Sequence, residues 1–434
     1  MLKIKSLNHI YIITILVFVQ AQAFSGNDSI PAQDTAMKNK IFRQNIKTVL
    51  LYRDGWDMSP PLLLYDSDEH LKLEFDDLEG DTKNYMFTIQ HCDKNWNPSE
   101  LDRFEYIDGY FDDYITDFEY SFNTSRQYTH YELLFPTENM SPKISGNYIL
   151  KVFVDEPDSL YFTRRFMVVE QRVDITGEVK DATEIAERNH KQEVDFEIKT
   201  TRVKIGNPYT ELFVRITQNG RLDNVIENIQ PKMVVGDKLN YDYDKEITFD
   251  GGNQFRSFDI KSLRYNTEYI DHIEKNFGEY DVFLKPDESR SYKVYKTIAD
   301  INGKFKIKTE DERNTAIEAE YVYVHFFLNY NVPLIEGDVY ILGELTDWDY
   351  TSYNKMNYDY KRKGYTKTLL LKQGYYNYMY ILLPHDNPVG EVSFFEGNHS
   401  ETGNEYTVWV YYHDPGKDYD ELIGVTHFDS REIE

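Results

Sequence analysis

Short segments in which apolar and polar residues alternate recur along the whole chain. Leu71, Leu73 and Phe75 alternate with Lys72 and Glu74, which is the period of two expected of a half-buried strand. Turn residues separate such runs, and aromatic residues, which strands favour, make up 15% of the sequence. The pattern predicts an all-β protein built from antiparallel β-sandwiches.

The predicted strands fall into three groups. The first group occupies residues 46–172, and the second occupies residues 173–301 with a hairpin turn at Asn219-Gly220, a pair that suits a type I′ turn. A polar segment, residues 302–320, separates these groups from residues 321–434. We therefore expect three immunoglobulin/fibronectin-like β-sandwich domains in tandem, the last two joined by a linker.

The first residues have the layout of a secretory signal peptide. Lys3 and Lys5 precede an apolar run at residues 10–19, and Ala21 and Ala23 supply the small residues of a cleavage site. The apolar run is too short to cross a membrane. The sequence therefore predicts a signal peptide at residues 1–23, export to the periplasm, and a flexible lead-in at residues 24–45.

The net charge of the chain limits the kinds of molecule that it can bind. The chain has 48 basic and 75 acidic residues, a formal net charge of −27. Such a surface repels nucleic-acid phosphates and anionic lipid headgroups. We expect no nucleic-acid partner and no direct membrane insertion.

Motifs for catalysis are missing from the sequence. It contains no G-x-S-x-G elbow, no H-E-x-x-H motif and no Cys/His cluster with zinc spacing. His91 and Cys92 are neighbours on a predicted strand, so their side chains should point to opposite faces, and Cys92 is read as a buried structural residue. His130 is read as a hydrogen-bonded structural group. The expectation is a protein without catalytic residues, metal, cofactor or small-molecule substrate, although the acidic turn at 76–81 leaves a structural Ca²⁺ open.

One connection is far longer than the rest. Within residues 91–136 a predicted strand ending at His91 runs into a long loop and returns as a second strand near Tyr128, whereas ordinary connections have about 4–6 residues. Aromatic side chains alternate with acids along it, and so many rings argue for order. Its rings either form a contact surface for another protein or roof the first sandwich. The candidate contact residues are Trp96, Phe104, Tyr106, Tyr110, Phe111 and Tyr114.

Part of the third group resembles glycogen-binding immunoglobulin-like modules. Leu342-Gly343, Asp347-Trp348 and the later Gly374-Tyr375-Tyr376-Asn377-Tyr378 carry this likeness. In such modules tryptophan either packs in the core or stacks on sugar. We expect Trp348 to pack, and a periplasmic glycan-binding protein is the alternative function.

A more specific resemblance covers residues 49–424. The chain resembles the type IX secretion system plug proteins of Bacteroidota, with one departure at Gln254, where glutamate is expected. The motifs include His91-Cys92-Asp93 with Trp96, Tyr106-Ile107-Asp108-Gly109, Gly252-Asn253-Gln254-Phe255-Arg256, Lys372-Gln373-Gly374 and Glu396-Gly397-Asn398.

The resemblance implies a periplasmic, non-enzymatic protein with an interaction role. Plug proteins close the periplasmic mouth of the wide outer-membrane translocon barrel when no cargo is present. On this reading the partner is that barrel, and the six candidate rings of the long connection contact it.

Overall fold

The computed structural model describes residues 37–310 and 313–431, so the predicted signal peptide lies outside the described residues. The fold class is confirmed: strands dominate and most pair antiparallel, because the alternating runs bury one face of each sheet. Three large hydrophobic cores lie between the sheets. We refer to the structure around each core as the first, middle and third unit.

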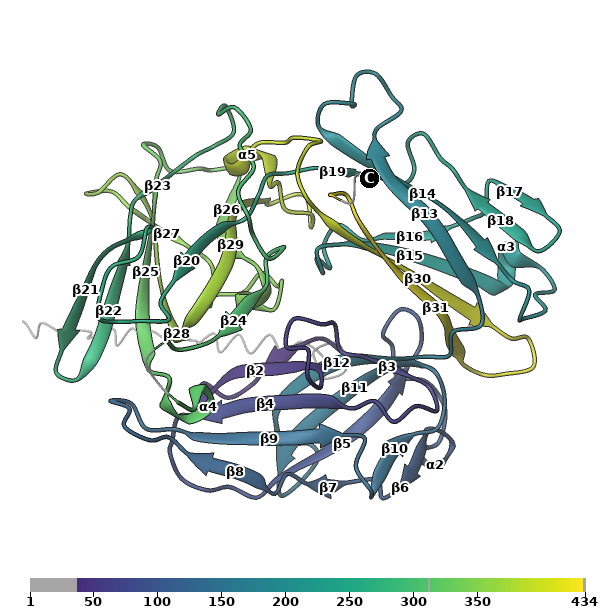
Figure 1. The fold of residues 1–434 in the computed structure, drawn as a ribbon, viewed down its shortest axis with the longest axis horizontal. Coiled ribbons are helices and arrows are strands. Elements are labelled where there is room, and N and C mark those ends of the chain that lie inside the picture. Colours follow the sequence, from purple (N-terminus) through teal and green to yellow (C-terminus); the bar gives the residue numbers. More distant parts are fainter. Residues whose placement is uncertain (1–36, 311–312, 432–434) are drawn as a thin grey trace, which may run out of the picture.

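The first unit is a sandwich of two sheets with a small two-stranded addition (Figure 1). One sheet has β1 (Lys40–Ile41), β12 (Leu160–Val169), β11 (Gly146–Val154), β5 (Tyr85–Cys92) and β7 (Asp113–Tyr114), with β3 (Leu62–Leu64) also paired to β12. The other has β2 (Ile46–Arg53), β4 (Leu71–Asp77), β9 (Thr129–Phe135) and β8 (Asp117–Tyr120). The long connection adds α2 (Arg103–Tyr106) and β6 (Ile107–Gly109), which pairs with β10 (Met140–Pro142).

The middle unit combines strands from two distant parts of the chain. One sheet has β13 (Asp174–Asp181), β14 (Lys191–Lys199), β18 (Lys238–Tyr241), β17 (Met233–Val235) and β19 (Thr248–Asp250). The other has β16 (Ile226–Ile229), β15 (Leu212–Gln218), β30 (Glu405–His413) and β31 (Asp420–Asp429). A short helix, α3 (Pro208–Glu211), precedes β15.

The third unit fills the chain between these two parts. One sheet has β20 (Arg256–Asp259), β29 (Gly374–Pro384), β24 (Phe305–Ile307) and β26 (Gly337–Leu342). The other has β21 (Ile270–Asn276), β22 (Glu279–Leu284), β25 (Tyr321–Asn329), β28 (Gly364–Lys372), β27 (Asn357–Asp359) and β23 (Asp287–Glu288). Short helical turns are α4 (Thr315–Glu318), η1 (Glu344–Thr346) and α5 (Ser393–Glu396).

Strand pairing differs from the predicted boundaries. Strand β30 pairs with β15 from Leu212↔Tyr412 to Gln218↔Tyr406, which places the last strands in the middle unit rather than the third. Residues 256–288 pair within the third unit rather than the second. Alternation reveals that a segment is a strand, but it does not encode which distant strand is its partner.

Two segments expected to be irregular carry structure. Strand β1 pairs with β12 inside the predicted lead-in. Strand β24 pairs with β29, and α4 forms, inside the predicted linker at 302–320. Both segments are polar in composition, and their order comes from partners far away in the sequence.

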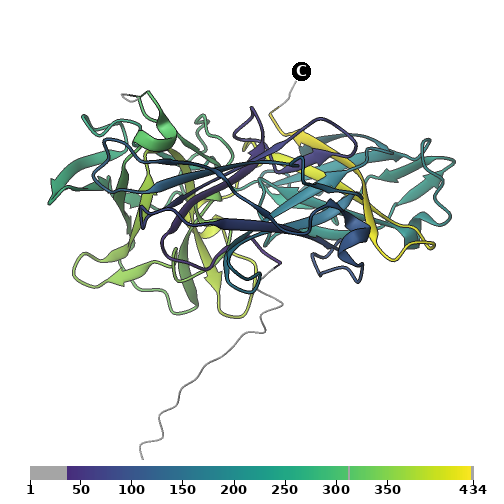
Figure 2. The same cartoon turned by 90° about the horizontal axis from the view of Figure 1, so that it is seen from below.

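The three units surround a common centre, and each contacts the other two (Figure 1). Seen from the side, the molecule is flattened (Figure 2). Polar and apolar groups from different units meet at each junction. Contacts across the junctions include Trp96 with Trp409 in one buried cluster, Lys372 with Asp76 at 2.6 Å, and Tyr350 with Asp223 at 2.6 Å.

Candidate functional site

The long connection is an ordered edge of the first unit. Its elements α2, β6, β7 and β8 lie along the lower margin of Figure 1, on the side away from the other two units. Arg103 holds the connection together, because its guanidinium donates to the Phe111 carbonyl at 2.5 Å and to the Asp112 carboxylate at 2.8 Å. A capping box between Asp102 and Glu105 starts α2. The edge is therefore held in place by the loop's own residues.

Four of the six candidate rings are exposed on this edge. The exposed fraction is 61% for Phe104, 67% for Tyr110, 40% for Phe111 and 55% for Tyr114. Large apolar side chains exposed together are typical of protein interaction sites. The rings of Phe118 and Tyr120 on β8 are exposed on the same edge and extend the surface. The alternation of acids and rings at 117–120 was the signal that could have added them to the candidate set.

Trp96 and Tyr106, by contrast with the prediction of an exposed contact surface, are buried. The guanidinium carbon of Arg165 lies 4.2 Å from the centre of the Trp96 ring. Trp96 belongs to the apolar cluster between the first and middle units. Tyr106 is 5% exposed and packs in the first core beside His91. Sequence alone cannot separate these rings from exposed ones in the same irregular segment, because the segment has no regular period.

The exposed edge is acidic as well as aromatic. Its basic side chains are engaged, since Arg103 binds within the connection and Lys143 donates to the Phe104 carbonyl at 3.0 Å. We call this surface the aromatic edge. It comprises the exposed rings Phe104, Tyr110, Phe111, Tyr114, Phe118 and Tyr120 and the exposed acids Asp102, Glu105, Asp108, Asp117 and Glu119.

A buried charge network joins the first and third units. Asp76 on β4 is fully buried, and its carboxylate accepts from Lys372 Nζ at 2.6 Å, Tyr321 Oη at 2.6 Å and His130 Nδ1 at 2.7 Å. Burial acts to raise the pKa of Asp76, but Lys372 and His130 outweigh it and hold the pKa below its usual value. Asp76 is therefore a buried carboxylate shared by two units, and His130 has the structural role that was predicted.

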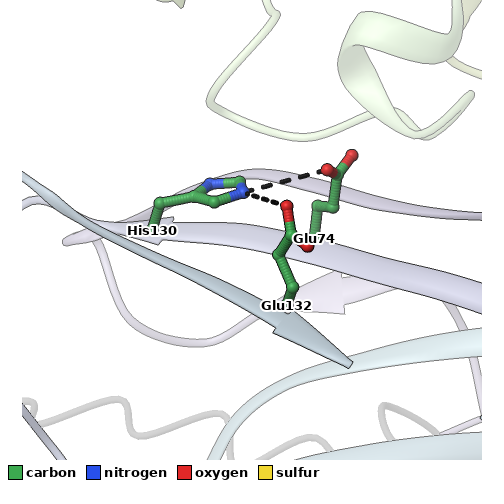
Figure 3. Close-up of side chains that lie close together, drawn as sticks. All are labelled: Glu74, His130 and Glu132. Carbon is green, nitrogen blue, oxygen red and sulfur yellow. Dashed lines mark hydrogen bonds and ion pairs between the residues drawn. The ribbon is translucent and has the colours of Figure 1, made fainter. Parts of the chain in front are cut away.

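The same histidine faces two glutamates on its other side. Nε2 of His130 lies 3.2 Å from Glu132 and 3.8 Å from Glu74 (Figure 3). Burial lowers the pKa of His130, but its hydrogen bonds to Asp76, Glu132 and Glu74 outweigh burial and raise the pKa to about 10. A protonated imidazole cannot ligate a metal. Lys72 supplies a second cation, with Nζ 2.8 Å from Glu74 and 3.0 Å from Glu132.

The other carboxylate groups that are close enough to share a cation also contain a lysine. Lys83 Nζ lies 2.6 Å from each of Asp77, Glu79 and Asp81, the acidic turn left open for Ca²⁺. In the cluster of Glu193, Asp195 and Asp242, Lys180 Nζ contacts Glu193 at 3.2 Å and also contacts Asp195. In each case an ammonium occupies the position that a cation would take, so the geometry favours ion-pair networks.

His91 and Cys92 do not form a catalytic pair. Cys92 is 1% exposed and belongs to the cluster between the first and middle units, whereas the His91 ring packs edge-on against Tyr148 at 5.0 Å. Burial raises the pKa of the Cys92 thiol to about 12 and lowers that of His91 to about 4. The thiol is therefore uncharged near neutral pH and is not poised as a nucleophile. The prediction that Cys92 is buried is confirmed.

Comparison with known proteins identifies the family. Residues 46–170 match the family model of the type 9 secretion system plug protein 1st domain. A hypothetical protein from Parabacteroides merdae ATCC 43184, known from its crystal structure, is 35% identical, with 90% of this chain and 99% of that chain covered and a TM-score of 0.88. The chain belongs to the type IX secretion system plug protein family.

Other comparisons add little to this assignment. The C-terminal domains of the antigen I/II-family protein AspA of Streptococcus pyogenes and of BspA of Streptococcus agalactiae are 8% and 7% identical, with 88% of this chain and 99% of each of those chains covered. Their TM-scores of 0.15 and 0.14 support no argument. No curated protein matches the chain. Among the described residues, no helix has the length and apolarity needed to cross a membrane.

Two of the motifs that resemble plug proteins meet in space. Arg256 Nε binds the Glu396 carboxylate at 3.0 Å, Asn253 donates to the Glu396 carbonyl at 2.7 Å, and the Gly252 amide donates to Asn398 at 2.9 Å. These residues form the crossing from the middle unit into the third unit. These two motifs therefore hold the crossing between the middle and third units in place.

A hollow of about 1390 Å³ lies where the three units meet, with residues of all three in its wall. Arg164 in this wall pairs with Asp347 at 3.4 Å, and Lys304 pairs with Glu405 at 3.1 Å. Trp348 is partly buried and packs edge-on against Phe255 at 6.0 Å, in line with its predicted packing role. The charges named here are satisfied within the protein, so they do not by themselves indicate a ligand.

Proposed function

We propose that this plug-family protein binds the outer-membrane translocon barrel of the type IX secretion system and closes its periplasmic mouth when no cargo is present. Membership of the family gives the protein a role in type IX secretion. The observation that supports closure is the mutual contact of the three units. A broad, flattened body whose parts are joined on all sides can cover an opening without yielding (Figures 1 and 2).

The junctions between units support this rigidity. Interfaces between domains of one chain are usually compatible with relative motion unless they are large or strongly coupled. Here the chain returns from the third unit to complete the middle sheet through β30 and β31. The Asp76–Lys372 pair adds a desolvated contact between the first and third units. Separation of the first and third units would expose a buried ion pair, and the middle and third units are held together by two crossings of the chain.

The aromatic edge is the surface that we assign to the barrel. It combines exposed rings with a scaffold that is already ordered, so binding requires little loss of conformational freedom. Tyrosine and other aromatic side chains are frequent anchors at protein interfaces. The role is non-enzymatic and periplasmic, and it needs neither metal nor cofactor.

Reconstitution can test the proposal. The translocon barrel of the same organism, placed in lipid vesicles loaded with a fluorescent dextran, should leak less when the purified protein is present on the periplasmic side. A variant with Tyr110→Ser and Phe111→Ser should lose this effect while its melting temperature stays near that of the parent. Equal leakage with and without the parent protein would refute closure of the barrel.

A matched control separates surface chemistry from general disruption. Tyr360→Ser and Tyr292→Ser remove exposed rings that do not belong to the aromatic edge. This control should close the barrel as the parent does. If it fails equally, the aromatic edge has no special role in binding.

A further inference from the structure

Strand β8 ends one sheet of the first unit and is open to solvent. The order of that sheet is β2-β4-β9-β8, so β8 has a neighbour on one side only. All four of its residues, Asp117 to Tyr120, are exposed, although the Phe118 ring also contacts the buried Tyr131 ring at a centroid distance of 5.8 Å. An edge strand of this kind presents unpaired backbone groups that can accept another strand.

The pairing with β9 shows which backbone groups face outward. The Ser121 amide donates to the Tyr128 carbonyl at 2.8 Å, so Ser121 points its backbone groups toward β9. In an antiparallel pair the direction of these groups alternates from residue to residue. The register Phe118↔Tyr131 and Tyr120↔Thr129 continues that pairing. Phe118 and Tyr120 therefore direct their N–H and C=O groups away from the sheet.

The side chains of β8 determine which strand could be added. Asp117 and Glu119 alternate with Phe118 and Tyr120, and the two rings contact each other at a centroid distance of 5.9 Å. A second copy of β8 would place acids against acids, which is unfavourable for cross-strand pairs. A strand with Lys or Arg at alternate positions would place opposite charges across the pair. The aromatic face can then cover the apolar residues of the same strand.

We propose that β8 accepts an extended, basic segment of the translocon as an additional antiparallel or parallel strand of its sheet. This inference rests on the proposed function and specifies how the aromatic edge recognises its partner. In strand addition, main-chain hydrogen bonds supply affinity and alternate side chains supply specificity. On β8 the main-chain bonds come from Phe118 and Tyr120, and the charge selection comes from Asp117 and Glu119.

Two substitutions at one position distinguish main-chain binding from side-chain contact. Tyr120→Ala removes the ring but keeps the outward N–H, whereas Tyr120→Pro removes both. Proline is tolerated on an edge strand where the N–H faces solvent. Affinity for the purified barrel, measured by surface plasmon resonance, should be about fivefold lower for Tyr120→Pro than for Tyr120→Ala, the effect of one lost hydrogen bond. Equal affinities of the two variants would overturn strand addition.

Hydrogen exchange gives an independent measurement that does not depend on a variant. In the complex of the unmodified full chain with the barrel, exchange of the Phe118 and Tyr120 amides should slow strongly. The Lys361 amide, exposed in the third unit and bonded to Asp359, serves as the internal reference. Unchanged exchange at Phe118 and Tyr120 in a saturated complex would also overturn the inference.

Charge reversal tests the chemistry of the added strand. Asp117→Lys with Glu119→Lys should weaken binding and reduce its dependence on salt, because attraction between exposed charges is screened by ions. Tighter binding of this variant would show that the added segment is acidic and would refute the basic assignment. If the unmodified protein does not bind the barrel at all, the proposed function itself fails. That result is distinct from every outcome described for the variants and for hydrogen exchange.

Discussion

Replacement of Lys372 by methionine should destabilise the protein strongly, because it leaves Asp76 buried without its ammonium partner. Lys372 is 2% exposed and Asp76 is fully buried, and their charged atoms are 2.6 Å apart. Methionine keeps most of the length of the lysine stem, so the substitution mainly removes charge. The lost interaction lies between the first and third units and therefore also tests how firmly they are joined.

The magnitude follows from the burial of the pair. Removal of one partner of a buried ion pair costs about 3–5 kcal/mol of unfolding free energy. His130 and Tyr321 still donate to Asp76, so we expect a loss near the lower limit, about 3 kcal/mol. Tyr321→Phe removes one hydrogen bond to the carboxylate and should cost about 1.5–3 kcal/mol.

Urea unfolding followed by circular dichroism and tryptophan fluorescence measures these losses. Lys367→Met is the matched control, because Lys367 lies on the same strand, β28, and donates only to the exposed Ser352 carbonyl at 2.9 Å. We expect this control to change stability by less than about 0.5 kcal/mol. A loss below about 1 kcal/mol for Lys372→Met would refute the reasoning, because it would mean that water reaches Asp76.

Three further predictions concern other parts of the molecule. Burial lowers the pKa of His91 to about 4, so the unfolded state binds a proton on this histidine at a higher pH than the folded state does. The free energy of unfolding should therefore fall by up to about 3 kcal/mol as the pH drops from about 6.5 to 4. Urea titrations at several pH values should show a smaller fall for His91→Leu, and an identical fall would contradict the assignment. Gly303 has φ +79°, and a Cβ there would lie 2.3 Å from the Trp348 ring, so Gly303→Ala should lower the free energy of unfolding by about 2 kcal/mol in the same assay. Gly236 has open space around it, so Gly236→Ala should lower the free energy of unfolding only through its positive φ, by about 1 kcal/mol. Because Lys83 Nζ occupies the acidic turn, millimolar CaCl₂ should leave the melting temperature unchanged in differential scanning fluorimetry, and a clear increase would identify a Ca²⁺ site.

Local pattern explains how much of the fold could be predicted. Alternation at Leu71, Leu73 and Phe75 identified β4, because a strand that buries one face has a period of two. The pairing of β30 with β15 could not be predicted in this way, since both strands would alternate equally well against other partners. The polar composition around β1 and β24 was misleading for a related reason. Short edge strands take their order from a neighbour and need few apolar residues of their own.

The candidate surface was predictable in part for the same physical reasons. The length and aromatic content of the 91–136 connection indicated an ordered surface, and Phe104 and Tyr110 are exposed on it. The burial of Trp96 depends on Arg165 and Trp409, which come from a different strand and a different unit. Contacts over such sequence distances leave no local signal. Buried and exposed rings in one irregular segment therefore look alike in the sequence.

The junction network and the binding edge share one strand of the first unit. His130 of the network lies on β9, and β9 pairs with β8 at Glu119↔His130 and Asp117↔Glu132. Neighbouring sites couple, whereas sites that are far apart and share no partners contribute independently. Variants of His130 should therefore lower both the stability of the protein and its affinity for the barrel. An unchanged affinity in a folded His130 variant would show that β8 keeps its binding geometry without this contact.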